Sequence, residues 1–386
     1  MRIAIDVRRI RDFGIGTYLR NLLRALGRAQ SRHEFLLIGP SEDRNQFRDL
    51  PPNFHHVPHK RGDRDRFDHL AFPLLIRNLD VDLTHIPLNR VPLFLPRPFV
   101  VTVHDISNLM FDPSPAWLRA LRTYRMVRGV SRAALVIAVS GATRKDLENL
   151  SGVSSERVRL VYNAPDPSFF HSPRLADARA AGPDSRALEQ RRILERYQIN
   201  EPFILYAGHI RPQKNIPRLV EAFAVARSSL QNDPQYSGLR LLIIGDEISR
   251  HPEVRRAVNQ SRVEHCVRFL GFVPFDTLRV FYEMAAAFVF PSLYEGFGLP
   301  PLEAMASGTP VVTSNVTALP EVVGDAAILV NPENVFEIAR GIIDVLIDPE
   351  IRATLIARGR ARAAQFSWRT AAEKVIEIYE EAVSLS

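Results

Sequence analysis

Apolar residues follow two alternating patterns along the chain. Short apolar runs, typical of strands buried in a parallel sheet, alternate with stretches in which apolar residues recur every three or four positions, as on one face of a helix. This alternation continues through both halves of the 386 residues. It predicts an α/β protein of two doubly wound domains. The predicted strands are residues 3–7, 35–38, 99–104, 135–139, 203–207, 241–244, 267–269, 287–291 and 311–313.

The alternating pattern stops between about Ser168 and Tyr197, where prolines, alanines and charged residues dominate. Such a segment is typical of an interdomain connection. We therefore expect a first Rossmann-like domain over residues 1–175, a connection over residues 176–200, and a second Rossmann-like domain over residues 201–365. Residues 366–386 follow a break in a helical pattern, and we expect them to form a C-terminal helix that packs back on the first domain.

Composition excludes several classes of protein. A hydrophobic fraction of 46% and a charged fraction of 24% are those of a packed globular protein. Cys266 is the only cysteine, which rules out an intramolecular disulfide and a cysteine-based zinc site. Apolar runs stay shorter than the ~18 residues needed to cross a bilayer, and a strand-like pattern takes the place of a signal peptide. These features predict a cytoplasmic location.

The segment from Phe290 to Gly308 carries the most specific chemistry. It begins as a buried strand, continues as a loop with Gly296 and Gly298, and reaches two prolines that suit the first turn of a helix. The free N–H groups of such a loop and helix start bind anions, so this segment predicts a diphosphate site. Glu295 and Glu303 lie beside it, and their carboxylates suit the binding of hydroxyl groups. The alternative is that Glu295 is a solvated loop residue and that Glu303 stabilises the helix dipole from the first turn.

This segment resembles the glutamate-seven-residues-glutamate motif of the retaining glycosyltransferases of family 4, whose GT-B architecture places two Rossmann-like domains around a central cleft. Eight other short motifs resemble family signatures in the expected order, and they are distributed over nearly the whole chain. They are Gly14–Tyr18, Val103–Asp105, Ala138–Ser140, Val161–Asn163, Tyr206–Gly208, Lys214–Asn215, Gly245–Asp246 and Leu319–Glu321.

The resemblance implies roles for residues of the second domain. Glu303 would bind the ribose hydroxyls of a nucleotide, Glu295 would be catalytic by positioning the transferred sugar, and Lys214 would bind the diphosphate. The backbone N–H groups of three consecutive residues would also bind the donor: Phe297, Gly298 and Leu299. The family arginine after Gly208 is replaced here by His209, and Arg211 is its expected substitute; for Lys214 and Arg211 the alternative is a solvated loop charge.

The resemblance makes the first domain, residues 1–175, the acceptor side. It also implies that Gly16 closes over the donor phosphates and that catalytic His104 faces the sugar. Neither residue is specific alone. Gly14-Ile15-Gly16 opens a helix as phosphate loops do, but Leu19 occupies the third glycine position of a dinucleotide-binding fingerprint, which disfavours a dehydrogenase. His104 ends an apolar strand, where a histidine is often only a hydrogen-bonded polar residue.

Two sets of residues have the form of metal ligands, yet we expect no metal and no cofactor. Asp80 and Asp82 resemble an acidic metal-binding pair, but they lie far from the glutamate motif. The other set contains no neighbouring acidic partner, and we interpret it as loop histidines. It consists of His55, His56 and His59.

Positive charge is concentrated in the first half. Residues 1–170 carry 26 Lys and Arg against 17 Asp and Glu, whereas the formal charge of the whole chain is +7. Residues 117–132 read as a helix with five arginines near one face, which indicates either a solvated face or attraction to anionic lipid on the inner face of the plasma membrane. Nucleic acid is not an expected partner.

These observations lead to one functional interpretation. The chain is predicted to be a metal-independent, retaining hexosyltransferase of surface polysaccharide biosynthesis, similar to bacterial mannosyltransferases. Its donor would be a GDP-sugar, with a UDP-sugar as the second choice, and its acceptor a hydroxyl of a saccharide or a lipid-linked saccharide. The alternatives are a nucleotide-sugar epimerase of similar architecture and a catalytically silent sugar-nucleotide-binding protein.

Overall fold

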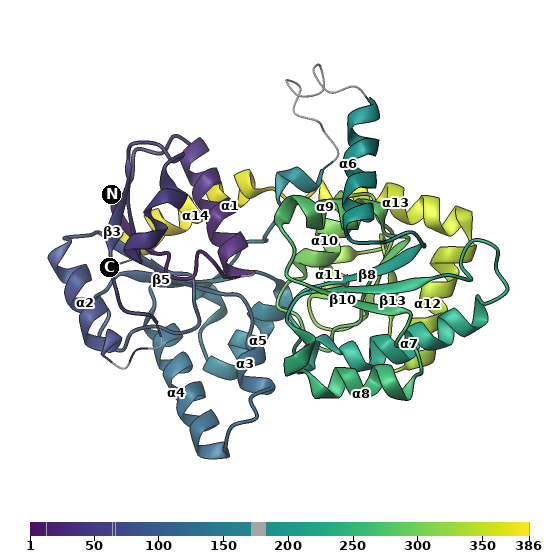
Figure 1. Ribbon diagram of the computed structural model, residues 1–386. Helices are drawn as coiled ribbons and strands as arrows, with labels where there is room; N and C mark the ends of the chain where they lie inside the picture. The colour runs from purple at the N-terminus through teal and green to yellow at the C-terminus, as the bar shows by residue number, and fades with distance from the viewer. Residues whose placement is uncertain (13, 64, 66, 171–182, 386) are drawn as a thin grey trace. The chain divides into compact units, whose positions relative to one another are not determined.

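The protein is seen here in a computed structural model, which describes residues 1–12, 14–63, 65, 67–170 and 183–385. The described residues divide into two compact units. The first comprises Met1–Ala164 and Phe366–Ser386, and the second comprises Pro165–Gln365. Each unit contains one parallel sheet with helices packed around it (Figure 1), so the predicted α/β architecture of two Rossmann-like domains is confirmed.

The division between the units falls earlier in the chain than residue 175. The short helix η3 (Pro167–Phe169) belongs to the second unit. Phe169 is fully buried there, because its ring packs edge-on against Phe275 and Tyr282 of helix α9, with centroid distances of 5.1 and 5.4 Å. Within the predicted connection, residues 176–182 lie outside the described residues, and helix α6 occupies Pro183–Arg196.

The first unit has a seven-stranded sheet in the order β3-β2-β1-β4-β5-β6-β7, with every pairing parallel. Its central strands are buried on both faces, which explains their continuous apolar runs. The strands are β1 (Arg2–Asp6), β2 (Glu34–Gly39), β3 (Phe54–Pro58), β4 (Leu83–Ile86), β5 (Phe99–Val103), β6 (Leu135–Ala138) and β7 (Val158–Leu160).

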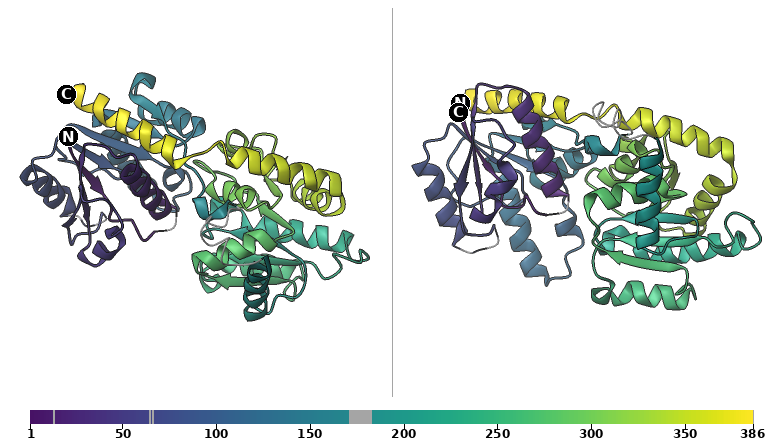
Figure 2. Two further views of the ribbon diagram at one scale, coloured as in Figure 1. Left: turned by 90° about the horizontal axis from the view of Figure 1, so that it is seen from above. Right: turned by 45° about the horizontal axis from the view of Figure 1, so that its top comes forward.

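The helices of the first unit connect successive strands, and the last of them comes from the far end of the chain. They are α1 (Ile15–Arg28), η1 (Ser41–Phe47), α2 (Asp68–Asn78), α3 (Ser107–Met110), α4 (Ala116–Arg132), α5 (Gly141–Ser151), η2 (Ser155–Arg157) and α14 (Trp368–Ser384). Helix α14 packs against α1 and against strands β4 and β5, so the two ends of the chain lie close together (Figure 2).

A buried chain of hydrogen bonds fixes α14 to the sheet. Nδ1 of His85 is 2.7 Å from the Tyr379 hydroxyl, and its Nε2 is 2.8 Å from Oγ1 of Thr102. The Tyr18 hydroxyl lies 3.2 Å from the same Thr102 oxygen. Burial lowers the pKa of His85 to about 3, so its ring stays neutral and joins α14, β4, β5 and α1 without a buried charge.

The second unit has a six-stranded parallel sheet in the order β10-β9-β8-β11-β12-β13. Its strands are β8 (Phe203–Ala207), β9 (Arg240–Ile244), β10 (Val267–Gly271), β11 (Ala287–Phe290), β12 (Val311–Ser314) and β13 (Ile328–Val330). Besides η3 and α6, its helices are η4 (Pro212–Lys214), α7 (Ile216–Ser229), η5 (Ile248–Arg250), α8 (Pro252–Gln260), α9 (Phe275–Met284), α10 (Leu299–Ala306), α11 (Leu319–Val323), α12 (Val335–Ile347) and α13 (Pro349–Ala363).

Candidate active site

The strand order of the second sheet reverses between β8 and β11. In doubly wound sheets the carboxyl ends of the strands at such a reversal diverge and leave room for a ligand. The loop after β8 carries Arg211 and Lys214, and the loop after β11 carries Glu295 and Gly298. The structure therefore brings the two sequence motifs of this domain together at one edge of its sheet.

Lys214 and Glu295 form an ion pair at this edge. Nζ of Lys214 lies 2.5 Å from Oε1 of Glu295, and only 18% and 11% of the two side chains are exposed. The ammonium also lies 5.2 Å from the centroid of the Phe290 ring. Sequence analysis assigned each of these residues to the site, but it did not predict that the Glu295 carboxylate would form an ion pair with Lys214.

Asn215, next to the lysine, is a residue of the site that sequence reasoning did not assign. Its backbone is left-handed, with φ of 61°, and its side-chain amide donates to the carbonyls of Pro291 and Pro332 at 3.0 and 2.7 Å. It thereby ties the loop after β8 to two other loops at the sheet edge. The residue type could have indicated this position in the sequence, because asparagine adopts the left-handed conformation more readily than most residues.

The turn before α10 needs a glycine. Gly298 has φ of +113°, and a Cβ there would lie 2.8 Å from a Leu319 methyl group. Pro300 and Pro301 have no N–H groups, so they remove two of the free donors that a helix start usually presents. Among the described residues, the N–H groups of Gly298 and Leu299 have no hydrogen-bond acceptor. They are the donors that this helix start can offer to an anion.

Glu303 lies in the second turn of α10 and is buried. Its Oε2 accepts a hydrogen bond from the Tyr282 hydroxyl at 3.1 Å. Burial raises the pKa of Glu303 to about 7, and the negative charge of Asp166 contributes to the increase. The alternative of a first-turn, dipole-stabilising carboxylate is therefore wrong, because the side chain points into the protein and contacts a buried tyrosine.

Arg211 is exposed at the start of η4, and His209 has a different partner. Nδ1 of His209 lies 2.9 Å from Oδ1 of Asp246, and Oδ2 of the same carboxylate accepts the Ile210 N–H at 2.9 Å. Burial would raise the pKa of Asp246, but these two hydrogen bonds lower it overall. Asp246 lies two residues after the end of strand β9, and the histidine that stands in the family arginine position is paired with it.

His104 follows β5 in the first unit. The edge of its ring contacts Tyr18 at a centroid distance of 4.6 Å, and its Nε2 is buried with no hydrogen-bond partner among the described residues. Burial lowers the pKa of His104 to about 4, although Asp105 and the Pro87 carbonyl oppose this change. The imidazole is therefore neutral at pH 7, with an unused ring nitrogen.

Gly16 lies in the first turn of α1, where the chain approaches itself closely. Its N–H donates to the Asp12 carbonyl at 3.0 Å, and a Cβ would collide with the Ile10 carbonyl oxygen. Glycine is therefore required for this packing. A phosphate role for Gly16 stays a prediction, and it would need a donor other than the engaged N–H.

Members of both sets of candidate metal ligands have protein partners. Asp82 accepts the Arg2 N–H at 2.7 Å, and His59 pairs with Asp68 at 2.9 Å. His56 stacks on Phe47, with ring centroids 5.4 Å apart. Within the described part of the chain, no group of three or more His, Cys, Asp or Glu side chains is arranged to hold a metal ion.

Comparison with known families agrees with this arrangement. Residues 14–169 match the family described as Glycosyltransferase Family 4, and residues 189–362 match Glycosyl transferases group 1. The chain is 33% identical over 288 residues to O-antigen chain mannosyltransferase B of Escherichia coli, an alignment that covers 73% of this chain and 70% of that protein. The chain belongs to the glycosyltransferases of family 4.

One further sequence relative and one solved structure are also similar to this chain. The chain is 32% identical over 246 residues to the serotype-specific mannosyltransferase WbdA of Escherichia coli. This alignment covers 64% of this chain but only 28% of that protein. The fold matches that of Anabaena HepE, solved with UDP and glucose, at a TM-score of 0.73, with 20% identity and 98% of both chains covered. The GT-B fold and the glycosyltransferase class are thus confirmed, and the epimerase and silent-binder alternatives are not favoured.

Proposed function

We propose that the protein transfers a mannosyl residue from GDP-mannose to a hydroxyl of a saccharide or lipid-linked saccharide, with retention of configuration and without a metal ion. The observation that carries this proposal is the edge of the second sheet, where Lys214 pairs with Glu295 in the loop that leads into α10, the helix that carries Glu303. The choice of mannose follows from two relatives, O-antigen chain mannosyltransferase B and the serotype-specific mannosyltransferase WbdA.

Loss of a diphosphate from the anomeric carbon places negative charge on the phosphate oxygens. The Lys214 ammonium and the N–H groups of Gly298 and Leu299 are donors suited to that charge. Each preorganised donor of this kind contributes about 2.7–4 kcal/mol to the transition state. A lysine and a helix start thereby supply the positive potential that a metal supplies in other transferases.

The two glutamates then have separate tasks. Glu303 accepts hydrogen bonds from the ribose hydroxyls, because it is held in the helix behind the anion site. Glu295 lies in the loop and positions the sugar hydroxyls while keeping Lys214 extended in the site. We propose no covalent nucleophile: the acceptor hydroxyl attacks the face that the diphosphate leaves, its proton passes to a phosphate oxygen, and His104 orients the sugar through its unused ring nitrogen.

A donor panel tests this proposal. We expect GDP-mannose to raise the melting temperature more than UDP-glucose does, since ligand at 100 times its Kd adds about 2.7 kcal/mol of stability. Transfer to a mannosyl acceptor is expected to proceed in EDTA and to give an α-linked product. Complete loss of activity in EDTA that magnesium restores, or inverted stereochemistry in the product, would contradict the proposed chemistry.

The proposed cellular location is the inner surface of the plasma membrane, reached through α4. No helix in the described part of the chain is long and apolar enough to span a bilayer. On α4, Trp117 and Tyr124 are 69% and 58% exposed, and Arg125 and Arg128 are also exposed. At 100° per residue these four side chains fall on one side of the helix.

The five arginines of α4 are not equivalent, which corrects the expectation of one continuous basic face. Arg132 donates to the carbonyls of Leu93 and Leu95, and Arg122 pairs with Asp112. Arg132 lies on the same side of the helix as the exposed aromatic side chains, but those carbonyls engage it, so Arg125 and Arg128 are the arginines on this side with exposed side chains. These two arginines are therefore the ones to change in a membrane-binding experiment.

We predict that the double variant Arg125→Gln/Arg128→Gln binds anionic vesicles at least tenfold more weakly than wild type, because each basic residue near an anionic surface contributes about 1 kcal/mol. Vesicle co-sedimentation with and without anionic lipid measures this. Arg28→Gln/Arg48→Gln removes two exposed charges elsewhere in the same unit and is the matched control. Equal binding of both double variants would remove α4 as the membrane contact.

A further inference from the structure

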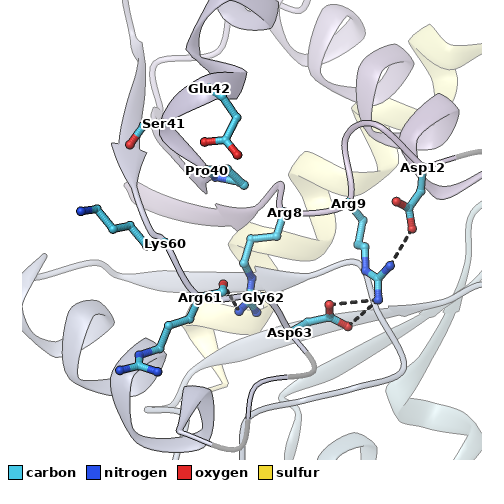
Figure 3. Close-up of a pocket in the computed structure, with 10 residues that line it drawn as sticks. All are labelled: Arg8, Arg9, Asp12, Pro40, Ser41, Glu42, Lys60, Arg61, Gly62 and Asp63. Carbon is cyan, nitrogen blue, oxygen red and sulfur yellow. Dashed lines mark hydrogen bonds and ion pairs between the residues drawn. The ribbon is translucent and has the colours of Figure 1, made fainter.

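A polar pocket of about 440 Å³ lies at the carboxyl edge of the first sheet, away from His104. Side chains that follow three neighbouring strands line it (Figure 3). They are Arg8, Arg9 and Asp12 after β1, Pro40, Ser41 and Glu42 after β2, and Lys60, Arg61, Gly62 and Asp63 after β3. Its volume is in the range of small-molecule sites, and most of its lining residues are charged, whereas most such sites are lined by apolar side chains.

Arg8 and Arg9 are paired with carboxylates and held in place before any ligand enters. Arg8, only 2% exposed, donates to both carboxylate oxygens of Asp6 and to Asp68 at 2.6–2.9 Å. Arg9 lies between Asp12 and Asp63, at 2.9 and 3.0 Å (Figure 3). Such pairs hold donors and acceptors in set directions, so a ligand does not have to order them.

The charge balance argues against an anionic ligand. Five carboxylates offset the four cations that line the pocket: Asp12, Glu42 and Asp63 in the lining, and Asp6 and Asp68 behind Arg8. An incoming phosphate would compete with these carboxylates for the same guanidinium groups. A neutral saccharide can instead accept hydrogen bonds from the remaining N–H groups and donate its hydroxyls to the carboxylates.

The position of the pocket relative to His104 indicates which part of a saccharide it would bind. All seven strands are parallel, so His104 after β5 and the pocket after β1, β2 and β3 share one edge. With neighbouring strands ~4.8 Å apart, β1 is about 10 Å from β5 and β3 about 19 Å. This separation exceeds the width of a single pyranose ring.

We infer that the pocket is a distal acceptor subsite, which binds sugar residues that precede the one receiving the transferred mannose. The inference rests on the proposed function, because it takes His104 as the point of transfer. It makes the acceptor an oligosaccharide of several residues. Affinity should then rise with acceptor length until the pocket is filled.

Calorimetric titration of the full chain with methyl α-mannopyranoside, mannobiose, mannotriose and mannotetraose tests the inference without turnover. We expect affinity to increase with acceptor length. We expect Arg9→Gln to lower the affinity for the longest oligosaccharides by about tenfold and to leave the affinity for the monosaccharide unchanged. Lys60→Gln, on an exposed loop residue, gives a second variant that leaves the buried ion pairs intact. Arg48→Gln is the matched control, because Arg48 is exposed after η1 and does not line the pocket.

Three results would overturn the subsite: equal affinity across the series, no measurable binding of any member, or length-dependent binding that both pocket variants retain. Displacement of mannotetraose by millimolar inorganic phosphate would instead identify an anion site. Length-dependent binding without transfer from any donor would contradict the proposed function and keep the subsite. Transfer at a rate that does not depend on acceptor length would contradict the subsite and leave the proposed function in place.

Discussion

Replacing Lys214 by alanine is expected to lower kcat by about 10²–10³-fold, the usual loss when one preorganised donor to a developing anion is removed. The ammonium lies at the strand-order reversal, is largely buried, and is held at 2.5 Å from Glu295. Arg211→Ala should lose less, because Arg211 is exposed. Steady-state kinetics with saturating GDP-mannose measures both variants.

Lys374→Ala is the matched control for this experiment, since Lys374 is exposed on α14. Removing Lys214 also leaves the Glu295 carboxylate without its partner, so a double-mutant cycle with Glu295→Gln is needed to separate the two effects. Turnover of Lys214→Ala within a few-fold of wild type would eliminate the diphosphate role.

Replacing Glu303 by alanine is expected to weaken donor binding by roughly 10–100-fold, because hydrogen bonds to a charged group contribute about 1.5–3 kcal/mol. The effect should fall on the Kd of GDP-mannose more than on kcat. Calorimetric titration gives the Kd, and thermal unfolding without ligand checks that the variant is folded. Unchanged affinity would place the ribose elsewhere.

Donor affinity should also depend on pH through Glu303. Its pKa of about 7 in the free protein means that the carboxyl is protonated below that pH. Ribose hydroxyls donate to the ionised form, so binding lowers this pKa and releases a proton. Affinity therefore falls as pH decreases below 7, by up to about tenfold per pH unit, and is constant above it.

Glu303→Gln should abolish this pH dependence, because the glutamine side chain does not titrate in this pH range. GDP-mannose is the suitable ligand, because its diphosphate is esterified at both ends and does not titrate near pH 7. The measurement is Kd between about pH 5.5 and 8.5. A slope that persists in the glutamine variant would assign the titration to another group.

Most of the fold could be predicted from apolar patterning, and the strands that were missed show where patterning fails. Strand β4 is central in its sheet, yet half of Leu83-Thr84-His85-Ile86 is polar. Thr84 and His85 are buried, and the partners of His85 come from β5 and α14. A buried polar residue is stable only when distant residues satisfy it, and no local window contains that information.

The same reasoning applies to the site. Residue types and spacing placed Glu303 on a helix and Glu295 in a loop, because glycines and prolines determine local backbone geometry. They could not predict that Tyr282 would contact Glu303 or that Glu295 would hold Lys214, since these contacts join segments 21 and 81 residues apart. Spacing predicts which residues share an element, and packing decides which elements meet.

Helix α14 has a consequence for how the chain folds during synthesis. Residues 165–365 form one continuous unit, whereas the first unit needs residues from both sides of it. Tyr379 follows His85 by 294 residues, so at about 5–20 residues per second it is made about 15–60 s later. Until then the Nδ1 atom of His85 lacks the tyrosine hydroxyl, and the second unit can complete its core while the first is still open. The half of the enzyme that is synthesised first is thus the last to be finished.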